Sequence, residues 1–332
     1  MQYRTVGKTD LSVSEIGFGC GNNAVLMVRA SYQDQLRAVR RALDLGINYF
    51  DTAFAYGSGK SEENLGRILR DLGAKPVVST KIRLEADSLS DLKGATIGAV
   101  EAALARLQRD EIDLIQLHTR ITNERNSGAR FSLAPQDVLG GVLDGFKEMR
   151  ARGKVRYFGF SGLGDPEALH RVVDSGEFHS FQVYYNMLNP SAGHRVPQGF
   201  SALDYGRIID RAAAKGMGAA VIRVLASGAL TDSPPSQGGS SGQTMSPGSD
   251  FPSDLARAKL VKAALGGEIA SLAQAAIRFA LMKPEVSTVL VGFSNVAHVE
   301  EAAACSGAGG LSDRAMAALR RLWDSDFGRL SA

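Results

Sequence analysis

Short apolar segments alternate with helix-like segments along almost the whole chain, and this alternation constrains the fold more than any other feature. Eight segments predict β-strands: residues 14–20, 46–51, 76–81, 112–118, 155–161, 178–184, 217–222 and 286–291. Apolar residues at helical spacing follow each of them, over 31–45, 61–72, 92–107, 136–152, 166–175, 203–215, 270–282 and 295–305. Apolar strands separated by single helices are typical of a parallel sheet covered by helices.

Eight strands favour a sheet that closes into an α/β barrel, the (β/α)8 TIM-barrel fold, over an open doubly wound sheet. No G-x-G-x-x-G sequence opens a helix after the first strand, which further weakens the open alternative. Residues 2–13 predict a β-hairpin that plugs one end of the barrel, and residues 313–323 predict an extra C-terminal helix. We therefore expect a single barrel domain over residues 1–332.

The composition excludes several classes of function. Lys and Arg number 38 against 35 Asp and Glu, so the net charge of +3 gives no reason to expect nucleic acid or acidic membranes as partners. Only two cysteines, Cys20 and Cys305, are present and lie far apart, which argues against a disulfide scaffold or a thiolate metal site. The polar N-terminus and the lack of a long apolar stretch predict a cytoplasmic protein. The sequence gives no indication of the oligomeric state.

Two long connections, 119–135 and 228–252, interrupt the alternation, and the second is rich in Ser, Gly and Pro. Both leave the carboxyl ends of predicted strands, where barrel enzymes place their active sites. Long irregular loops in a compact domain are often functional, so we expect these two to be lids over a site. Ser61 and Asp165 are expected to cap the helices that follow them.

Four polar residues follow consecutive predicted strands. Asp51 ends the second strand and Tyr56 lies in the loop beyond it, while Lys81 ends the third strand and His118 the fourth. Each alone would be ordinary, because charged groups at strand ends are often caps or salt-bridge partners. Strand ends in a barrel converge on one rim, so the four side chains are expected to meet there.

These four groups suit proton transfer to an oxygen atom. Lys81 held by Asp51 would favour the phenolate form of Tyr56, which could then donate or accept a proton near neutral pH. His118 could orient a carbonyl group or assist the transfer. None of the four is a redox centre, so a reduction would need a cofactor to supply hydride. Metal binding by Asp51 and His118 is disfavoured, because Lys81 competes for the carboxylate.

The stretches around these residues, DTAFAYG at Asp51, STK at Lys81 and IDLIQLH at His118, resemble those of the aldo-keto reductase family over nearly the full chain. The resemblance implies a barrel that binds NADP(H), or less often NAD(H), in an extended pose. It also implies a catalytic tetrad of Asp51, Tyr56, Lys81 and His118. Tyr56 would act as general acid in reduction and as general base in oxidation.

The resemblance implies a cofactor site built from several loops. Ser161 and Gln182 match residues that hold the nicotinamide carboxamide, although Gly162 replaces the usual Asn. Arg223 would stack on the nicotinamide or pair with the pyrophosphate. The full set of expected cofactor contacts is Gly19, Cys20, Gly21, Asp51, Ser161, Gln182, Arg223, Leu225, Ser227, Gly228, Gly292, Phe293, Ser294, His298 and Glu301.

The adenosine end of this site is expected where the eighth strand meets its helix, at VGFSNVAHVEEA. A phosphate at a helix N-terminus meets free backbone N–H groups. The Lys or Arg that usually grips the 2′-phosphate is missing, and Ser294 and His298 occupy the region, Ser294 being alternatively a helix cap. The resemblance nevertheless favours NADP(H) over NAD(H). Phe54, Tyr56, His118 and Trp323 are expected to form the substrate pocket, although Trp323 could equally pack the last helix onto the barrel.

The sequence thus predicts an NAD(P)(H)-dependent oxidoreductase that passes hydride between the nicotinamide and a carbonyl or alcohol, such as an aldehyde, ketone or sugar. An NAD-preferring dehydrogenase that oxidises a sugar lactol or pyridoxal is the alternative, since one transition state serves both directions. A cofactor-binding regulatory subunit, similar to the barrel subunits of some potassium channels, would keep the same four residues.

Overall fold

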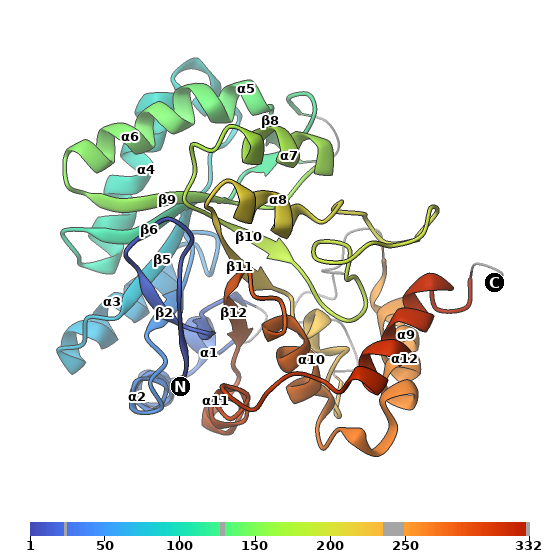
Figure 1. Ribbon diagram of the computed structural model, residues 1–332. Helices are drawn as coiled ribbons and strands as arrows, with labels where there is room; N and C mark the ends of the chain where they lie inside the picture. Colours follow the sequence, from blue (N-terminus) through green and yellow to red (C-terminus); the bar gives the residue numbers. More distant parts are fainter. Residues whose placement is uncertain (23–24, 127–129, 235–248, 330–332) are drawn as a thin grey trace.

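The computed structural model describes residues 1–22, 25–126, 130–234 and 249–329 of the chain. Eight parallel strands form a closed barrel surrounded by helices (Figure 1). In barrel order, starting from the first in sequence, they are β3 (Ile16–Gly19), β4 (Tyr49–Asp51), β5 (Val77–Ile82), β6 (Ile112–Leu117), β9 (Val155–Ser161), β10 (Ser180–Tyr184), β11 (Gly218–Ile222) and β12 (Val286–Gly292). Pairing of β12 with β3 closes the ring, so the predicted (β/α)8 barrel is confirmed.

The N-terminal hairpin covers the amino end of this barrel. Strands β1 (Tyr3–Thr5) and β2 (Ser12–Ser14) pair antiparallel, as predicted. Apolar residues of the hairpin segment pack against residues of the barrel strands in a small buried cluster: Val6, Leu11, Val13, Tyr49, Leu114, Ala220 and Leu290. The hairpin therefore closes one end of the barrel and leaves the carboxyl ends of the strands for a site.

Most of the predicted helices are present, with small shifts at their ends. Their bounds are α2 (Tyr32–Asp44), α3 (Lys60–Leu72), α4 (Leu92–Leu107), α5 (Pro135–Asp137), α6 (Leu143–Ala151), α7 (Pro166–Asp174), α8 (Ile208–Ala214), α10 (Leu272–Leu281), α11 (Val296–Ala303) and α12 (Asp313–Asp324). A π-helical turn over Val138–Val142 separates α5 from α6, because Gly140 takes non-helical backbone angles. The predicted helix over 203–215 is shorter than expected at its start.

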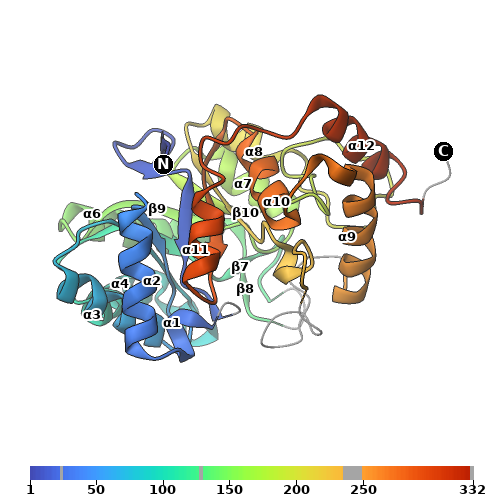
Figure 2. The same ribbon diagram turned by 90° about the horizontal axis from the view of Figure 1, so that it is seen from below.

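Several elements lay outside the predicted pattern. Helix α1 (Leu26–Arg29) follows the first barrel strand, and helix α9 (Phe251–Leu265) precedes α10. Helices α9 and α12 contact each other beside the barrel (Figure 2). Among the described residues no single helix is long and apolar enough to cross a bilayer. Two consecutive helical segments, Phe251–Glu268 and Leu272–Leu281, would together be long and apolar enough, but the chain bends by 89° between them.

Side-chain caps fix the start of many helices, but the predicted cap at Ser61 is wrong. Helix α3 begins after Gly59, whose φ of 94° suits glycine, and Ser61 lies inside the helix. The Ser61 hydroxyl is buried and donates to the carbonyl oxygen of Cys20 at 3.0 Å. Asp165 does occupy the cap position of α7, yet its carboxylate accepts from the backbone N–H of Asn123 and makes no bond within the helix.

The two long connections differ. The first contains a small parallel pair, β7 (Arg120–Ile121) with β8 (Ser132–Leu133), beside the carboxyl ends of the barrel strands. The second contains a short 3-10 turn at Ala226–Gly228, and its residues 235–248 lie outside the described part of the chain. Their roles as lids remain predictions.

Candidate active site

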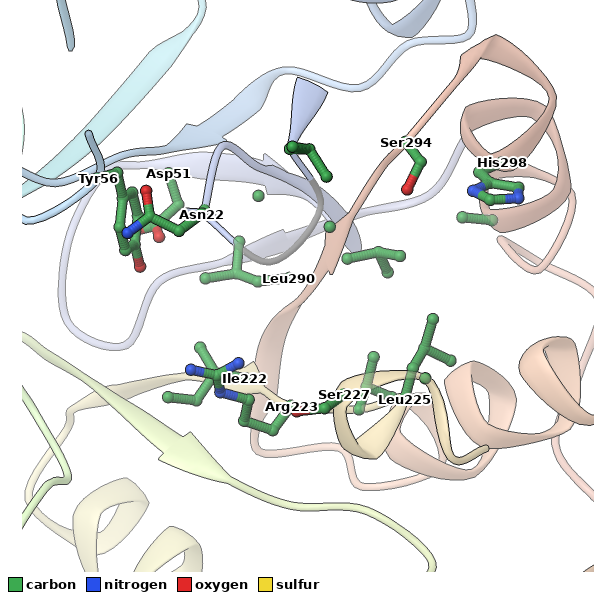
Figure 3. A pocket seen from close by; sticks show the side chains of 18 of the residues that line it. Asn22, Asp51, Tyr56, Ile222, Arg223, Leu225, Ser227, Leu290, Ser294 and His298 are labelled. Carbon is green, nitrogen blue, oxygen red and sulfur yellow. The ribbon is translucent and has the colours of Figure 1, made fainter. Parts of the chain in front are cut away.

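A cavity of about 1200 Å³ opens at the carboxyl ends of the barrel strands. It extends from Tyr56 and Asp51 at one end to Ser294 and His298 at the other (Figure 3). We call the Tyr56 side the near end and the His298 side the far end. The cavity is long and large enough for an extended ligand, since sites for drug-sized ligands usually measure about 300 to 1000 Å³.

Lys81 is the centre of the polar network at the near end. Its Nζ donates to Asp51 Oδ2 at 2.5 Å, to the carbonyl oxygen of Thr52 at 2.9 Å and to the hydroxyl of Tyr56 at 3.3 Å. The Lys81 side chain is 1% exposed, so these bonds replace water as its partners. Adjacent strands β4 and β5 bring Asp51 and Lys81 together, as the sequence predicted.

Gln182 completes the network from the opposite side of the barrel. Its Nε2 donates to Asp51 Oδ1 at 2.5 Å, so both oxygens of this buried carboxylate have a partner. From the sequence, Gln182 was expected to contact only the carboxamide of the cofactor. The two residues lie 131 positions apart, and the sequence pattern did not predict this bond because it depends on how the side chains point across the closed barrel.

Burial and charge fix the protonation of two groups. Burial lowers the pKa of Lys81, but the charges and hydrogen bonds of Asp51 and Tyr56 outweigh it, and the pKa is raised. Lys81 is therefore an ammonium near neutral pH. Burial, followed by the positive charges of Lys81, Arg83 and Arg223, lowers the pKa of His118 to about 3. His118 is neutral and presents one N–H donor beside Tyr56, with the two rings edge to face at 6.0 Å.

The loop that carries Tyr56 turns sharply. Gly57, Ser58 and Gly59 follow one another in the left-handed region, with φ of 64°, 53° and 94°. Glycine suits two of these positions, whereas Ser58 takes a conformation that is uncommon for a residue with a side chain. Asn22 donates from Nδ2 to the carbonyl oxygen of Ala55 at 3.2 Å and ties the loop to the segment after β3.

The walls of the cavity carry buried polar atoms without a partner. The hydroxyls of Ser161 and Ser227 are both buried and make no hydrogen bond within the described chain. Such orphaned groups are uncommon in folded proteins and suit a polar ligand. Arg223 and Ser227 also have left-handed φ of 61° and 59°, and Asn186 Nδ2 holds the Arg223 carbonyl at 2.9 Å. These residues fit a nicotinamide cofactor.

The far end is more open. Ser294 and His298 are exposed, and Glu301 is half-buried and accepts from the hydroxyl of Ser271 at 2.7 Å. Asn295, rather than Ser294, caps α11 by accepting from the backbone N–H of His298. The alternative that Ser294 is the helix cap is thus wrong. Asp232 reaches this end from the β11 side and pairs with Lys262 at 2.8 Å.

Most of the predicted cofactor residues line the cavity: Gly19, Gly21, Asp51, Ser161, Gln182, Arg223, Leu225, Ser227, Gly228, Gly292, Ser294, His298 and Glu301. Cys20 and Phe293 do not line it, because their side chains are buried in the apolar core. Sequence analysis missed several other lining residues, among them Asn22, Asp232, Ile222 and Leu290. Of these four residues, Ile222 alone had a position in the sequence that could have marked it as a lining residue, because it directly precedes Arg223 at the end of a predicted strand.

Two predicted substrate-pocket residues lie elsewhere. Phe54 is 40% exposed and stacks against the guanidinium of Arg106 outside the cavity, since the turn after β4 directs alternate side chains to opposite sides. Trp323 is fully buried, packs against Phe279 and donates to the carbonyl oxygen of Met187 at 2.8 Å. Trp323 therefore fixes the last helix to the barrel, as the alternative interpretation held. Tyr56 and His118 do line the cavity.

Comparison with known proteins agrees with this geometry. The model of the aldo/keto reductase family matches residues 15–324. L-galactose dehydrogenase of Arabidopsis thaliana is 26% identical over 304 residues, covering 91% of this chain and 86% of that protein. The holo form of aldo-keto reductase AKR11C1 from Bacillus halodurans superimposes with a TM-score of 0.74 at 24% identity, covering 98% of this chain and 97% of that one.

An aldo-keto reductase from Klebsiella pneumoniae, solved in complex with NADPH, has a TM-score of 0.68 at 22% identity and full coverage of both chains. At these identities the two solved structures establish the fold. The family match spans nearly the whole chain and agrees with the predicted motifs. This chain is a member of the aldo/keto reductase family.

Proposed function

We propose that this protein transfers hydride between NAD(P)(H) and a small carbonyl or alcohol substrate, with Tyr56 as the proton donor and acceptor. One observation carries the proposal: the Lys81 ammonium contacts both the Tyr56 hydroxyl and the Asp51 carboxylate at the near end of a long cavity. A phenol beside a buried ammonium is suited to give a proton to a substrate oxygen and to hold the charge left behind.

The residues have distinct tasks in the reduction direction. A nicotinamide cofactor, when bound, would supply the hydride that the carbonyl carbon needs. Tyr56 gives its hydroxyl proton to the carbonyl oxygen, so that an alcohol can form. Lys81 stabilises the resulting phenolate, and Asp51 keeps Lys81 charged and fixed in place. Neutral His118 donates a hydrogen bond to the substrate oxygen and orients the carbonyl group. Oxidation follows the same steps in reverse.

The orphaned Ser161 hydroxyl, next to Gln182 on the neighbouring strand, would hold the nicotinamide carboxamide. Because Gln182 Nε2 is engaged by Asp51, its carbonyl oxygen is the atom left to accept from that amide. Arg223 and Ser227 are placed along the cavity wall between the two ends, where they would contact the nicotinamide or the pyrophosphate (Figure 3).

The far end bears on the choice between NADP(H) and NAD(H). These two cofactors differ only by the 2′-phosphate on the adenosine ribose of NADP(H). The NADPH complex of the Klebsiella pneumoniae relative supports NADP(H), the expected cofactor. The acidic side chains of Glu301 and Asp232 support NAD(H), since Lys262 already pairs with Asp232, whereas Arg29 and Arg223 are the basic residues that line the cavity. The residues outside the described part of the chain include no Lys or Arg. We propose that NAD(H) binds at least as well as NADP(H).

The polar near end supports a proposal for the substrate class, and the proposed cofactor preference supports one for the direction. A cavity with an N–H donor at His118 and a hydroxyl at Tyr56 suits a hydroxylated carbonyl, such as a sugar or its lactol. The similarity to L-galactose dehydrogenase, and a charge distribution that suits NAD(H), support oxidation of a sugar lactol as a second candidate reaction.

Tyr56→Phe tests the proposal most directly. Loss of a general acid typically lowers turnover by 10² to 10⁴-fold, so kcat should fall by about this factor while the Kd of the cofactor stays unchanged. Turnover should be followed by the absorbance of the reduced nicotinamide, with aldoses, pyridoxal, methylglyoxal and aromatic aldehydes, and with both cofactors. Normal turnover of every substrate by the variant would show that Tyr56 is not the proton donor.

A further inference from the structure

We propose that Arg106, which lies on α4 outside the cavity, is a positioning residue that holds Tyr56 in place. Together with Glu62 and Phe54 it forms what we call the loop clamp. The inference rests on the proposed function of Tyr56. It adds a residue that no motif of the tetrad contains and explains why Phe54 lies outside the substrate pocket.

Arg106 contacts both ends of the loop that carries Tyr56. Its guanidinium carbon lies 4.8 Å from the centre of the Phe54 ring, a cation–π arrangement. At the other end of the loop, its aliphatic stem fills the space beside Gly59, where a Cβ atom would lie only 2.7 Å from Arg106 Cδ. Tyr56 is midway between these two contacts, so a single side chain from α4 braces the turn from outside.

Glu62 fixes the direction of Arg106. This carboxylate is fully buried, and its Oε2 accepts from Arg106 Nε at 2.5 Å. Its Oε1 accepts from the hydroxyl of Thr80 at 2.5 Å. Burial raises the pKa of Glu62, although the bonds from Thr80 and Arg106 act against it. Because Thr80 directly precedes Lys81 on β5, the loop clamp joins the Tyr56 loop to the strand that carries Lys81.

Bonds within the loop fix its turns, but the bonds that tie it to the neighbouring chain segments are long, at 3.2 to 3.3 Å. Ser58 and the two glycines beside it have left-handed backbone angles, which L-residues rarely adopt. Inside the loop Gly59 donates to the Phe54 carbonyl at 2.7 Å, whereas the bond that ties the loop to the Lys81 carbonyl is longer, at 3.3 Å. The 3.3 Å contact between Tyr56 and Lys81 Nζ therefore depends on how the loop is held from outside.

Release of the clamp should affect turnover and leave cofactor binding intact. Many residues that line the far end and the cofactor wall come from β9, β11, β12 and α11, whereas the contacts of Arg106 described above are with Phe54, Gly59 and Glu62. A displacement of about 1 Å at a reacting group can lower a rate by about 10²-fold. We expect Arg106→Ala to lower kcat by about 10 to 50-fold and to change the Kd of NADH and NADPH by less than about twofold.

The experiment compares Arg106→Ala with Arg109→Ala, measuring kcat, KM, cofactor Kd by protein fluorescence, and the folded fraction by circular dichroism. Arg109 is a matched control, because it lies near the end of the same helix, is similarly exposed and pairs with Asp113 at 3.0 Å. Asp113 lies near the amino end of β6, away from the cavity. Arg109→Ala should lower stability and keep kcat per folded molecule within about twofold.

Two further variants keep the test decisive if Arg106→Ala does not fold. Arg106→Lys keeps the charge beside Glu62 and should restore part of kcat. Phe54→Leu removes the stacking face and should lower kcat several-fold with Kd unchanged. Equal kcat per folded molecule in the Arg106 and Phe54 variants and the wild type, or a parallel loss of cofactor binding, would overturn the inference. Full turnover by Tyr56→Phe would instead overturn the proposed role of Tyr56.

Discussion

The two ends of the cavity are built differently. At the near end Asp51, Lys81 and Gln182 are almost fully buried, and both carboxylate oxygens and the ammonium have short hydrogen bonds. At the far end Ser294 and His298 are exposed, and the ion pair between Asp232 and Lys262 faces solvent. Fixed charges in a buried site stabilise charge that develops during a reaction, whereas solvated charges mainly adjust affinity. The near end is thus organised for the chemical reaction, and the far end for adjusting the affinity for the ligand.

The largest difference between the two ends should appear in the unfolding free energy when Lys81 at the near end or Lys262 at the far end is replaced. Lys81→Met leaves the buried Asp51 carboxylate without its cation, and breaking a buried pair typically costs about 3 to 5 kcal/mol. Lys262→Met breaks an ion pair whose members are both about half exposed, so the loss should be under about 1 kcal/mol. Urea unfolding of both variants measures these free energies.

Turnover provides the control for this pair. Lys81→Met should lose nearly all activity even where it is fully folded, and Lys262→Met should keep its kcat. Similar costs for the two substitutions would contradict the view that only the near end is preorganised.

A smaller effect should appear in how stability changes with pH, because of His118. Its pKa in the folded protein is about 3, whereas an unperturbed histidine has a pKa of 6.5. Between these values the unfolded chain binds a proton that the folded protein does not, so stability falls as pH decreases below 6.5. Replacement by glutamine, His118→Gln, removes this proton. Between pH 7 and pH 5 the wild type should lose about 1 to 2 kcal/mol more unfolding free energy than the variant.

Urea unfolding at a series of pH values checks this expectation. His179 and His194, whose pKa values are also lowered by burial, contribute equally to both proteins and cancel in the comparison. Parallel pH profiles for the variant and the wild type would mean that His118 is not held neutral in the folded protein.

The smallest effect is expected at the far end. Glu301→Gln removes one negative charge near the expected position of the 2′-phosphate, and a partly solvated charge is worth about 1 kcal/mol. The Kd of NADPH should fall by about fivefold, and the Kd of NADH should change less. Glu300→Gln is the matched control, because Glu300 faces α2 and pairs with Arg41 at 2.7 Å. Equal Kd changes for both cofactors would place the 2′-phosphate elsewhere.

Sequence patterns predicted the barrel and the near end in detail, and they failed where a contact depends on closure of the ring. The meeting of Asp51, Tyr56, Lys81 and His118 could be predicted because they follow three consecutive strands, and parallel strands have their carboxyl ends on one rim. The bond from Gln182 to Asp51 and the position of Arg106 against Phe54 could not, because they depend on side-chain orientations that packing sets. Ser61 was misplaced because an N-cap and a buried helical serine have the same local sequence.

The sequence by itself determined the order of strands and helices, the apolar faces that bury them and the groups available for proton transfer, because these follow from local periodicity and residue chemistry. Only the tertiary structure decided which of these groups touch. Burial around Lys81 and His118 set their protonation, and the closed barrel brought Gln182 to Asp51. The tertiary structure also placed Trp323 in the core and Phe54 at the surface. Packing determines where an aromatic side chain lies, and packing depends on the whole chain.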